Sequence, residues 1–310
     1  MILIGTAFAT ESRSDADVRI DWRGAVTFIA GLGLLMLAIT QLPGAASLSP
    51  LLLAQFAAGV ALLIAFVMIE KRAAHPLLDL DLLRDRQFAA WCLACASLAL
   101  GSTAVLVTLP TYLQGVNGIS PGRAGAVMLM LTVPIIAVPS LGARLVNGGA
   151  PPRLVITAAL AAMALGNAWL LVLHPGISAA GLLGPLVTIG AGAGLAIGII
   201  DARAMALVSP DRVGMASGLL NTVRGGSNAV LLALVGAAMV TLLRVSLGDD
   251  ALAQQVSSGN LRGPDPALLA DSLTTVWRFT LVGIAALCAA SAATVAVLLR
   301  PAPSHPTKEN

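Results

Sequence analysis

One apolar stretch of the sequence, Val213 to Leu243, carries a stripe of polar side chains. Its members are Ser217, Asn221, Arg224 and Asn228. They recur at i, i+4, i+7 and i+11, which places them on one face of an α-helix. Such groups can bind a polar ligand or a counter-charge, whereas lipid cannot hydrogen-bond them. The spacing therefore predicts a helix whose polar face meets a watery cavity, a charge partner or a ligand.

Arg224 is the most demanding member of this stripe. It lies about 16 Å into the helix, counted at about 1.5 Å per residue from Val213. An unpaired guanidinium at that depth costs at least about 2.5 to 3.5 kcal/mol. Two interpretations stay open, because Arg224 can either lock two helices through a buried ion pair or line a functional cavity. Asp201 borders an apolar run and is the candidate charge partner, although Arg203 and Arg212 are favoured as its own partners.

A second pattern lies in the stretch from Ala179 to Ile200. Gly190, Gly194 and Gly198 follow one another at four-residue spacing and clear one helix face, so that the backbone of a neighbour can come close. Pro134 and Pro139 predict a bend in another apolar stretch. The glycines therefore predict tight helix packing, at a contact where two helices can slide or rock.

No residue pattern indicates an enzyme or a metal site. The sequence contains no His-Glu-x-x-His, no Gly-x-Ser-x-Gly and no phosphate-binding glycine loop with lysine. The cysteines, Cys92, Cys95 and Cys288, all fall in apolar runs, where packing is favoured over redox or metal chemistry. Asn167 is a lone polar residue expected to form an interhelical hydrogen bond. We therefore expect no catalytic residue, no metal and no cofactor.

The elements that must position these residues follow from composition. Hydrophobic residues make up 57% of the 310 positions and charged residues only 11%, which excludes a water-soluble monomer. Eight apolar runs are each long enough to cross a hydrocarbon core of about 30 Å as a helix. They predict an all-α membrane protein, a polytopic bundle of about eight transmembrane helices. The runs are Ala25 to Leu42, Leu51 to Ile69, Phe88 to Leu109, Ala124 to Ala143, Leu154 to Leu173, Ala179 to Ile200, Val213 to Leu243 and Phe279 to Leu299.

The distribution of basic residues predicts the orientation. With the C-terminus in the cytoplasm, 13 of the 18 lysines and arginines fall in inside segments. The net charge of +3 is thus an orientation signal and not a nucleic-acid footprint. We expect a multi-pass protein of the cell inner (plasma) membrane, in contact with the lipid bilayer and not with nucleic acid.

Three segments resemble the fourteen-helix drug:proton antiporter branch of the major facilitator superfamily. The most specific is SPDRVGMASGLLNTVR, Ser209 to Arg224, and the others are PLLDL, Pro76 to Leu80, and LPTYLQ, Leu109 to Gln114. Asp21 to Ala25 resembles the entry to the seventh helix of that family, and Glu11 to Arg13 the segment after the sixth. Asn221 and Arg224 match the family's Asn-Thr-x-Arg on a helix that lines the cavity.

The resemblance implies a domain organisation of the major facilitator type that lacks the N-terminal six-helix half. The predicted segments are 1–24, the remnant of a preceding helix plus a cytoplasmic loop; 25–69, two central linker helices; 70–86, a cytoplasmic loop; 87–300, the C-terminal six-helix transporter half; and 301–310, a cytoplasmic tail.

The leading hypothesis is a membrane transporter that exports drugs or small amphipathic metabolites by proton antiport, as a truncated C-terminal portion. Its cavity is expected between the third, fourth, sixth and seventh runs, with Ser217, Asn221, Arg224 and Asn228 as a polar wall. Expected partners are a small-molecule substrate, protons, and a missing N-terminal half or second chain. The alternatives are a non-transporting membrane protein that is truncated or partner-dependent, and a carrier for uptake of a small solute.

Overall fold

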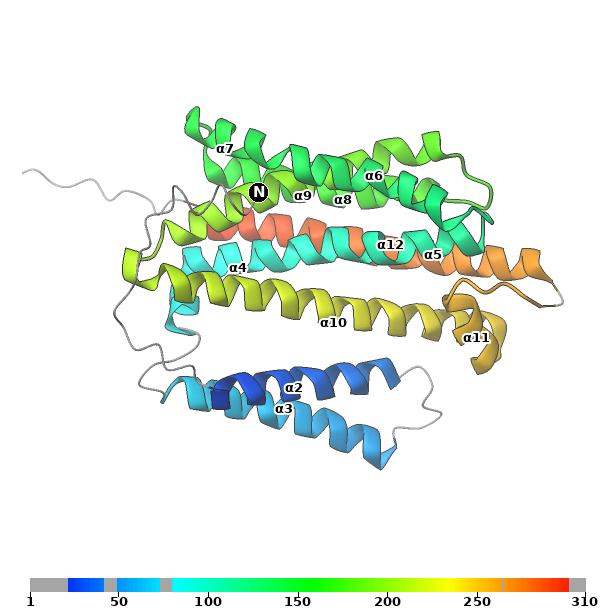
Figure 1. Ribbon diagram of the computed structural model, residues 1–310, viewed down its shortest axis with the longest axis horizontal. Coiled ribbons are helices and arrows are strands. Elements are labelled where there is room, and N and C mark those ends of the chain that lie inside the picture. Colours follow the sequence, from blue (N-terminus) through cyan, green and yellow to red (C-terminus); the bar gives the residue numbers. More distant parts are fainter. Residues whose placement is uncertain (1–21, 42–48, 73–79, 264, 301–310) are drawn as a thin grey trace, which may run out of the picture.

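The computed structural model describes residues 22–41, 49–72, 80–263 and 265–300. Its helices lie nearly side by side along one axis (Figure 1). In chain order the elements are α2 (Trp22–Gln41), α3 (Pro50–Glu70), η2 (Leu80–Arg84), α4 (Arg86–Leu98), η3 (Ala99–Thr103), α5 (Ala104–Gly115), α6 (Pro121–Ala137), α7 (Pro139–Asn147), α8 (Pro152–Trp169), η4 (Leu170–Val172), α9 (Ala179–Met205), η5 (Pro210–Arg212), α10 (Val213–Leu247), α11 (Asp250–Ser257) and α12 (Pro266–Leu298).

The prediction of about eight transmembrane helices is confirmed. Within the described residues, eight helices are long and apolar enough to cross a membrane. The third is built from α4, η3 and α5, where η3 is a π-helical turn. The fourth is built from α6 and α7, which are separated at Val138, so the interruption falls between the two prolines that predicted a bend. The predicted segment 301–310, most of 1–24 and part of 70–86 lie outside the described residues.

The stretch between the seventh and eighth predicted runs is largely helical, which corrects the start of the last helix. That helix begins at Pro266 and not at Phe279, and α10 continues to Leu247. The reason is local capping: the carboxylate of Asp249 accepts a hydrogen bond from Leu252 N at 3.0 Å, and that of Asp265 accepts one from Leu268 N at 3.1 Å. Each carboxylate satisfies a free N–H group of a helix start, which an apolar-run search does not detect.

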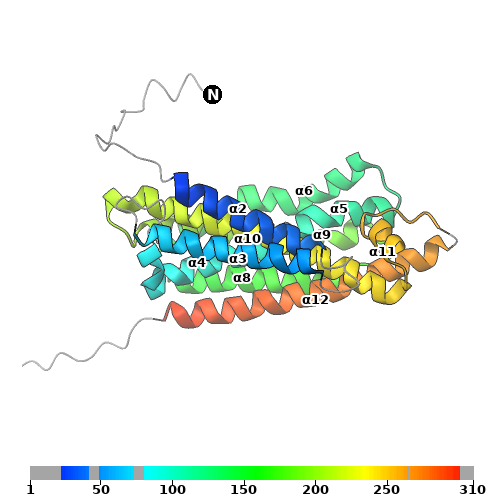
Figure 2. The same cartoon turned by 90° about the horizontal axis from the view of Figure 1, so that it is seen from below.

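The first two helices form a hairpin against the rest of the bundle. Gly31 of α2 and Gly59 of α3 face each other, since a Cβ at either position would lie about 3 Å from the carbonyl oxygen of the other. α2 also contacts α10. Figure 2 shows the hairpin lying over α10 when the molecule is seen from below. The hairpin is therefore a separate layer, outside the six helices that follow it in the sequence.

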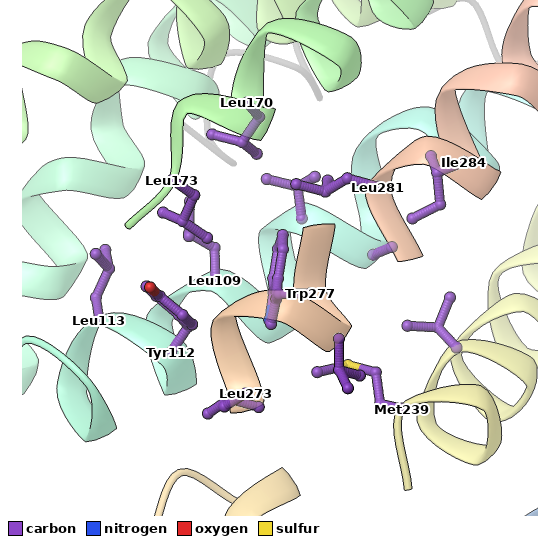
Figure 3. Close-up of a cluster of buried hydrophobic side chains, with 14 of the residues drawn as sticks. Leu109, Tyr112, Leu113, Leu170, Leu173, Met239, Leu273, Trp277, Leu281 and Ile284 are labelled. Carbon is purple, nitrogen blue, oxygen red and sulfur yellow. The ribbon is translucent and has the colours of Figure 1, made fainter. Parts of the chain in front are cut away.

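Two clusters of buried apolar side chains hold those six helices together, one toward each end of the bundle. The cluster at the α11 end includes Tyr112, Met239 and Trp277, which Figure 3 draws as sticks, and the ring centroids of Tyr112 and Trp277 lie 6.0 Å apart. The buried hydroxyl of Tyr112 in this cluster is hydrogen-bonded, since it lies 2.8 Å from the hydroxyl of Thr274. The cluster at the opposite end includes Phe88, Ile156 and Ile200. This second cluster lies at the end of the bundle that also holds Asp201 and the first turns of α10.

Candidate functional site

The four residues of the predicted polar stripe all lie in the first half of α10. This helix contacts α4, η3, α9, α12 and α2. Asn221 is exposed, whereas Ser217, Arg224 and Asn228 are half-buried. The stripe therefore runs along the border between packed and open surface. Its members differ in what they contact: Arg224 bonds to α9 and Asn228 to η3, whereas Asn221 bonds to Arg224 within α10.

Arg224 forms an ion pair with Asp201 of α9. The guanidinium Nη2 lies 2.6 Å from Oδ1 of Asp201, and Nη1 donates to Oδ1 of Asn221 at 3.1 Å. The two charged side chains keep exposed fractions of 29% and 49%. The Nε atom is buried and has no hydrogen-bond partner. The guanidinium therefore has a counter-charge on one side and unused donor capacity on another, in a position that is still partly accessible.

Asp201 lies inside α9, because that helix continues past Ile200 to Met205. The sequence favours Arg203 or Arg212 as its partner at a helix end, but the structure pairs it with Arg224, 23 positions further along the chain. The cause is the packing of α9 against α10. Proximity in sequence misleads here, because successive residues of a helix point in different directions.

Cys95 also contacts this site, which the sequence did not suggest. Its thiol lies beside the Arg224 guanidinium and 3.8 Å from the carbonyl oxygen of Leu220. All three cysteines of the chain are free and buried. Cys95 thus packs at the contact between α4 and α10. The Cys-x-x-Cys spacing was the signal that could have drawn attention to it.

Asn228 connects α10 to the π-helical turn of the third span. Its Oδ1 accepts a hydrogen bond from Thr103 Oγ1 at 2.8 Å. Asn167 of α8 donates from Nδ2 to Gly101 O of the same turn at 2.9 Å, so the interhelical hydrogen bond expected of Asn167 is confirmed. A π turn leaves backbone carbonyls without their usual partners. The two asparagines therefore brace this turn from two helices.

Ser217 lies one turn before Asn221 and takes no part in the Arg224–Asp201 pair. A cavity of about 580 Å³ lies on an adjacent face of α10 and is lined by residues of α2, α4, η3, α10 and α12. On α10 its lining includes Thr222, Gly226 and Ser227 and not the four stripe residues. The structure thus brings Asn221, Arg224 and Asp201 together, and leaves Ser217 and Asn228 outside that cluster.

The glycines of α9 lie against α6 and α7. A Cβ at Gly190 would collide with the carbonyl oxygen of Leu131, and at Gly194 and Gly198 it would lie 2.7 Å from the carbonyl oxygens of Pro134 and Pro139. Real Cβ atoms do not approach backbone oxygens so closely. The three positions therefore need glycine, and they set the distance between α9 and its neighbours.

A family comparison connects this architecture with known proteins. Residues 2–232 match the Major Facilitator Superfamily, well over half of the chain.

The chain belongs to the major facilitator superfamily.

Several curated members of this superfamily are similar to the chain. The multidrug resistance protein Stp of Mycobacterium tuberculosis is 29% identical over 250 residues, which are 80% of this chain and 46% of Stp. The drug efflux pump JefA of the same organism is 31% identical over 242 residues, 76% of this chain and 46% of JefA. The cephamycin export protein CmcT of Amycolatopsis lactamdurans is 35% identical over 231 residues, 71% of this chain and 46% of CmcT.

The chain spans a little less than half the length of these relatives. Together with the eight apolar helices, the superfamily match makes it a multi-pass membrane protein of a transporter family. The names of these three similar proteins refer to multidrug resistance, drug efflux and cephamycin export. The Arg224–Asp201 pair joins α10 and α9, two of the helices that are long and apolar enough to cross a membrane.

Proposed function

We propose that these eight helices act in the export of drugs or small amphipathic metabolites by proton antiport. The observation that supports the proposal is the partly exposed Arg224–Asp201 pair, joined to Asn221, in a chain whose relatives are named for drug efflux and antibiotic export. The polar stripe supplies donors and acceptors, and the surrounding helices supply apolar surface. This combination suits an amphipathic substrate.

In this proposal Asp201 carries the proton, and Arg224 changes its contacts when Asp201 gains or loses that proton. While Asp201 is ionised, it holds the guanidinium at 2.6 Å. Protonation removes that counter-charge and frees Nη2 to bind a substrate or to reorient. Ser217, Asn221, Arg224 and Asn228 then form one wall of a cavity whose facing wall belongs to an N-terminal half. Alternating access of two halves would expose this cavity to each side of the membrane in turn.

We further propose that the chain corresponds to the two central helices and the C-terminal half of a fourteen-helix transporter. The hairpin of α2 and α3, set apart from the six following helices, supports that division. The distribution of lysines and arginines supports a cytoplasmic C-terminus. Labelling of single cysteines introduced at Lys71 and Ser178 tests the orientation, since Lys71 is then inside and Ser178 outside. Labelling of Lys71 from the outer face contradicts it.

The decisive experiment uses everted membrane vesicles that contain these helices together with an N-terminal half. Respiration acidifies the vesicle interior, and a pH-sensitive dye reports the gradient. An amphipathic substrate added outside should collapse part of the gradient as protons leave in exchange for it. Substrate accumulation without proton movement contradicts antiport. Failure to move any of a panel of dyes supports the non-transporting alternative, and substrate-driven acidification supports uptake.

A further inference from the structure

A second site, built from other residues than the polar stripe, lies at the end of the bundle where α4 begins and α9 ends, the end at which α10 also begins (Figure 1). It is a cavity of about 550 Å³ between the starts of α4 and α8 and the ends of α9 and α12. Its lining includes Arg153, Arg203, Gln87 and Trp91. None of these residues takes part in the proposed transport cluster.

The two arginines of this cavity form no ion pair with any acidic residue that the structure describes. The Nε atom of Arg153 is buried and makes no hydrogen bond. A buried donor on a cation is costly when it is left unpaired. The two half-buried guanidinium groups that share this cavity, one of them with a buried unpaired donor, therefore favour an anionic occupant.

The walls of the cavity indicate what carries that anion. Leu154 and Leu207 line it and are 60% and 41% exposed, so apolar surface continues from the cavity to the outside of the bundle. Trp91, near the start of α4, is almost completely buried beside it. Tryptophan and arginine together are typical of the membrane interface, where phosphate groups meet acyl chains. The ligand thus has a charged end and an apolar end.

The size of the cavity favours an occupant larger than a small inorganic ion. Cavities of about 300 to 1,000 Å³ hold drug-sized groups, whereas an inorganic phosphate would leave most of the space unfilled. A phosphodiester headgroup with its glycerol backbone matches both the volume and the two cations. Basic pockets between transmembrane helices bind acidic headgroups in this manner.

We propose that this cavity is a binding site for an anionic phospholipid, with Arg153 and Arg203 on the phosphodiester and with Leu154 and Leu207 along the first methylene groups of the acyl chains. The site lies where α4 and α8 begin and where α9 and α12 end. Its occupant therefore ties these four helices to one leaflet of the bilayer. The inference does not depend on which substrate the protein moves.

The test measures lipid binding to the purified full chain in mild detergent by native mass spectrometry, with thermal unfolding in parallel. Phosphatidylglycerol should bind and raise the unfolding temperature, whereas phosphatidylcholine should do neither. The double variant Arg153→Gln/Arg203→Gln should lose affinity for phosphatidylglycerol on the order of tenfold. Arg144→Gln is the matched control, because Arg144 is an exposed arginine on α7 that does not line the cavity.

Three outcomes overturn the proposal: equal binding of both lipids, unchanged phosphatidylglycerol binding in the double variant, or the same loss in Arg144→Gln. Stabilisation by inorganic phosphate alone, at the lipid concentration used, makes this a free-anion site and overturns the lipid assignment. If the double variant aggregates, Arg153→Lys/Arg203→Lys takes its place. It keeps both charges but lacks the planar guanidinium donors, so binding of phosphatidylglycerol should fall less and should not vanish.

Discussion

The adjacent helices α9 and α10 both contain several glycines, but these glycines have opposite structural roles in the two helices. In α9, Gly190, Gly194 and Gly198 lie directly against backbone oxygens of α6 and α7. In α10, Gly214, Gly225, Gly226 and Gly236 have no neighbouring atom within 4 Å of the position that a Cβ would take. Glycine allows close packing on the first helix and leaves open surface on the second. One ion pair, Arg224–Asp201, joins the two helices near one end.

The comparison indicates that the two helices have different roles. α9 is fixed to its neighbours along its length and holds Asp201 in place. α10 contributes the polar groups and borders open surface, so it can meet a substrate or another half of a transporter. Rigid support behind a partly open polar face is the arrangement that a binding wall requires. Three predictions test how far this contrast extends.

The largest effect is expected from filling the close contact on α9. Gly194→Ala places a methyl group 2.7 Å from the carbonyl oxygen of Pro134, so α9 and α6 must separate. Overpacking of this kind costs about 1 to 3 kcal/mol. Gly236→Ala is the matched control on α10, because nothing lies within 4 Å. Thermal unfolding in detergent should show a clear loss for Gly194→Ala alone, and equal unfolding temperatures would remove the contrast between the helices.

The next effect concerns the charge on α10. In a transporter that contains these helices, Arg224→Gln should lower efflux roughly tenfold, because a charge-assisted hydrogen bond to Asp201 is lost. Arg224→Lys keeps a cation but cannot reach Asp201 and Asn221 together, so part of the efflux should remain. Both variants should stay within a few-fold of normal membrane level, since a partly exposed ion pair contributes little to stability.

The membrane level separates the two roles of Arg224. If folded Arg224→Gln protein falls in step with efflux, and Asp201→Asn falls likewise, the pair is a lock between α9 and α10. Loss of one partner of a buried pair costs about 3 to 5 kcal/mol, enough to prevent folding. Lost efflux with normal levels instead supports a role in the transport cycle.

The smallest effect is expected where α10 meets the π-helical turn. Thr103→Val and Asn228→Ala each remove one neutral hydrogen bond, so each should cost about 0.5 to 1.5 kcal/mol of unfolding free energy. Because the two groups bond to each other, a double-mutant cycle should give a coupling energy of about 1 kcal/mol. Thr108→Val is the control, since its hydroxyl bonds to Ala104 O of its own helix. No coupling between Thr103 and Asn228 would mean that they do not brace the turn.

The sequence by itself determined the membrane helices and the polar face of α10. Both are local properties: an apolar run of at least 18 residues spans the bilayer only as a helix, and helical periodicity places Asn221 and Arg224 on one side. It also determined that Arg224 must meet a watery cavity, a counter-charge or a ligand, because an isolated charge at that depth is costly. The resemblance carried by Ser209 to Arg224 led to the superfamily that the family comparison shows.

Only the tertiary structure decided which residues of different helices contact one another. Asp201 is the partner of Arg224 because α9 packs on α10. The spacing of residues along one helix does not specify how that helix is aligned against its neighbour. The same holds for Thr103 with Asn228, and for Arg153 and Arg203, which lie 50 positions apart and share a cavity. The early start of α12 at Pro266 depended on a side-chain cap at Asp265. Local periodicity fixes a helix and its faces, whereas the neighbours of each face follow from the packing of all the helices together.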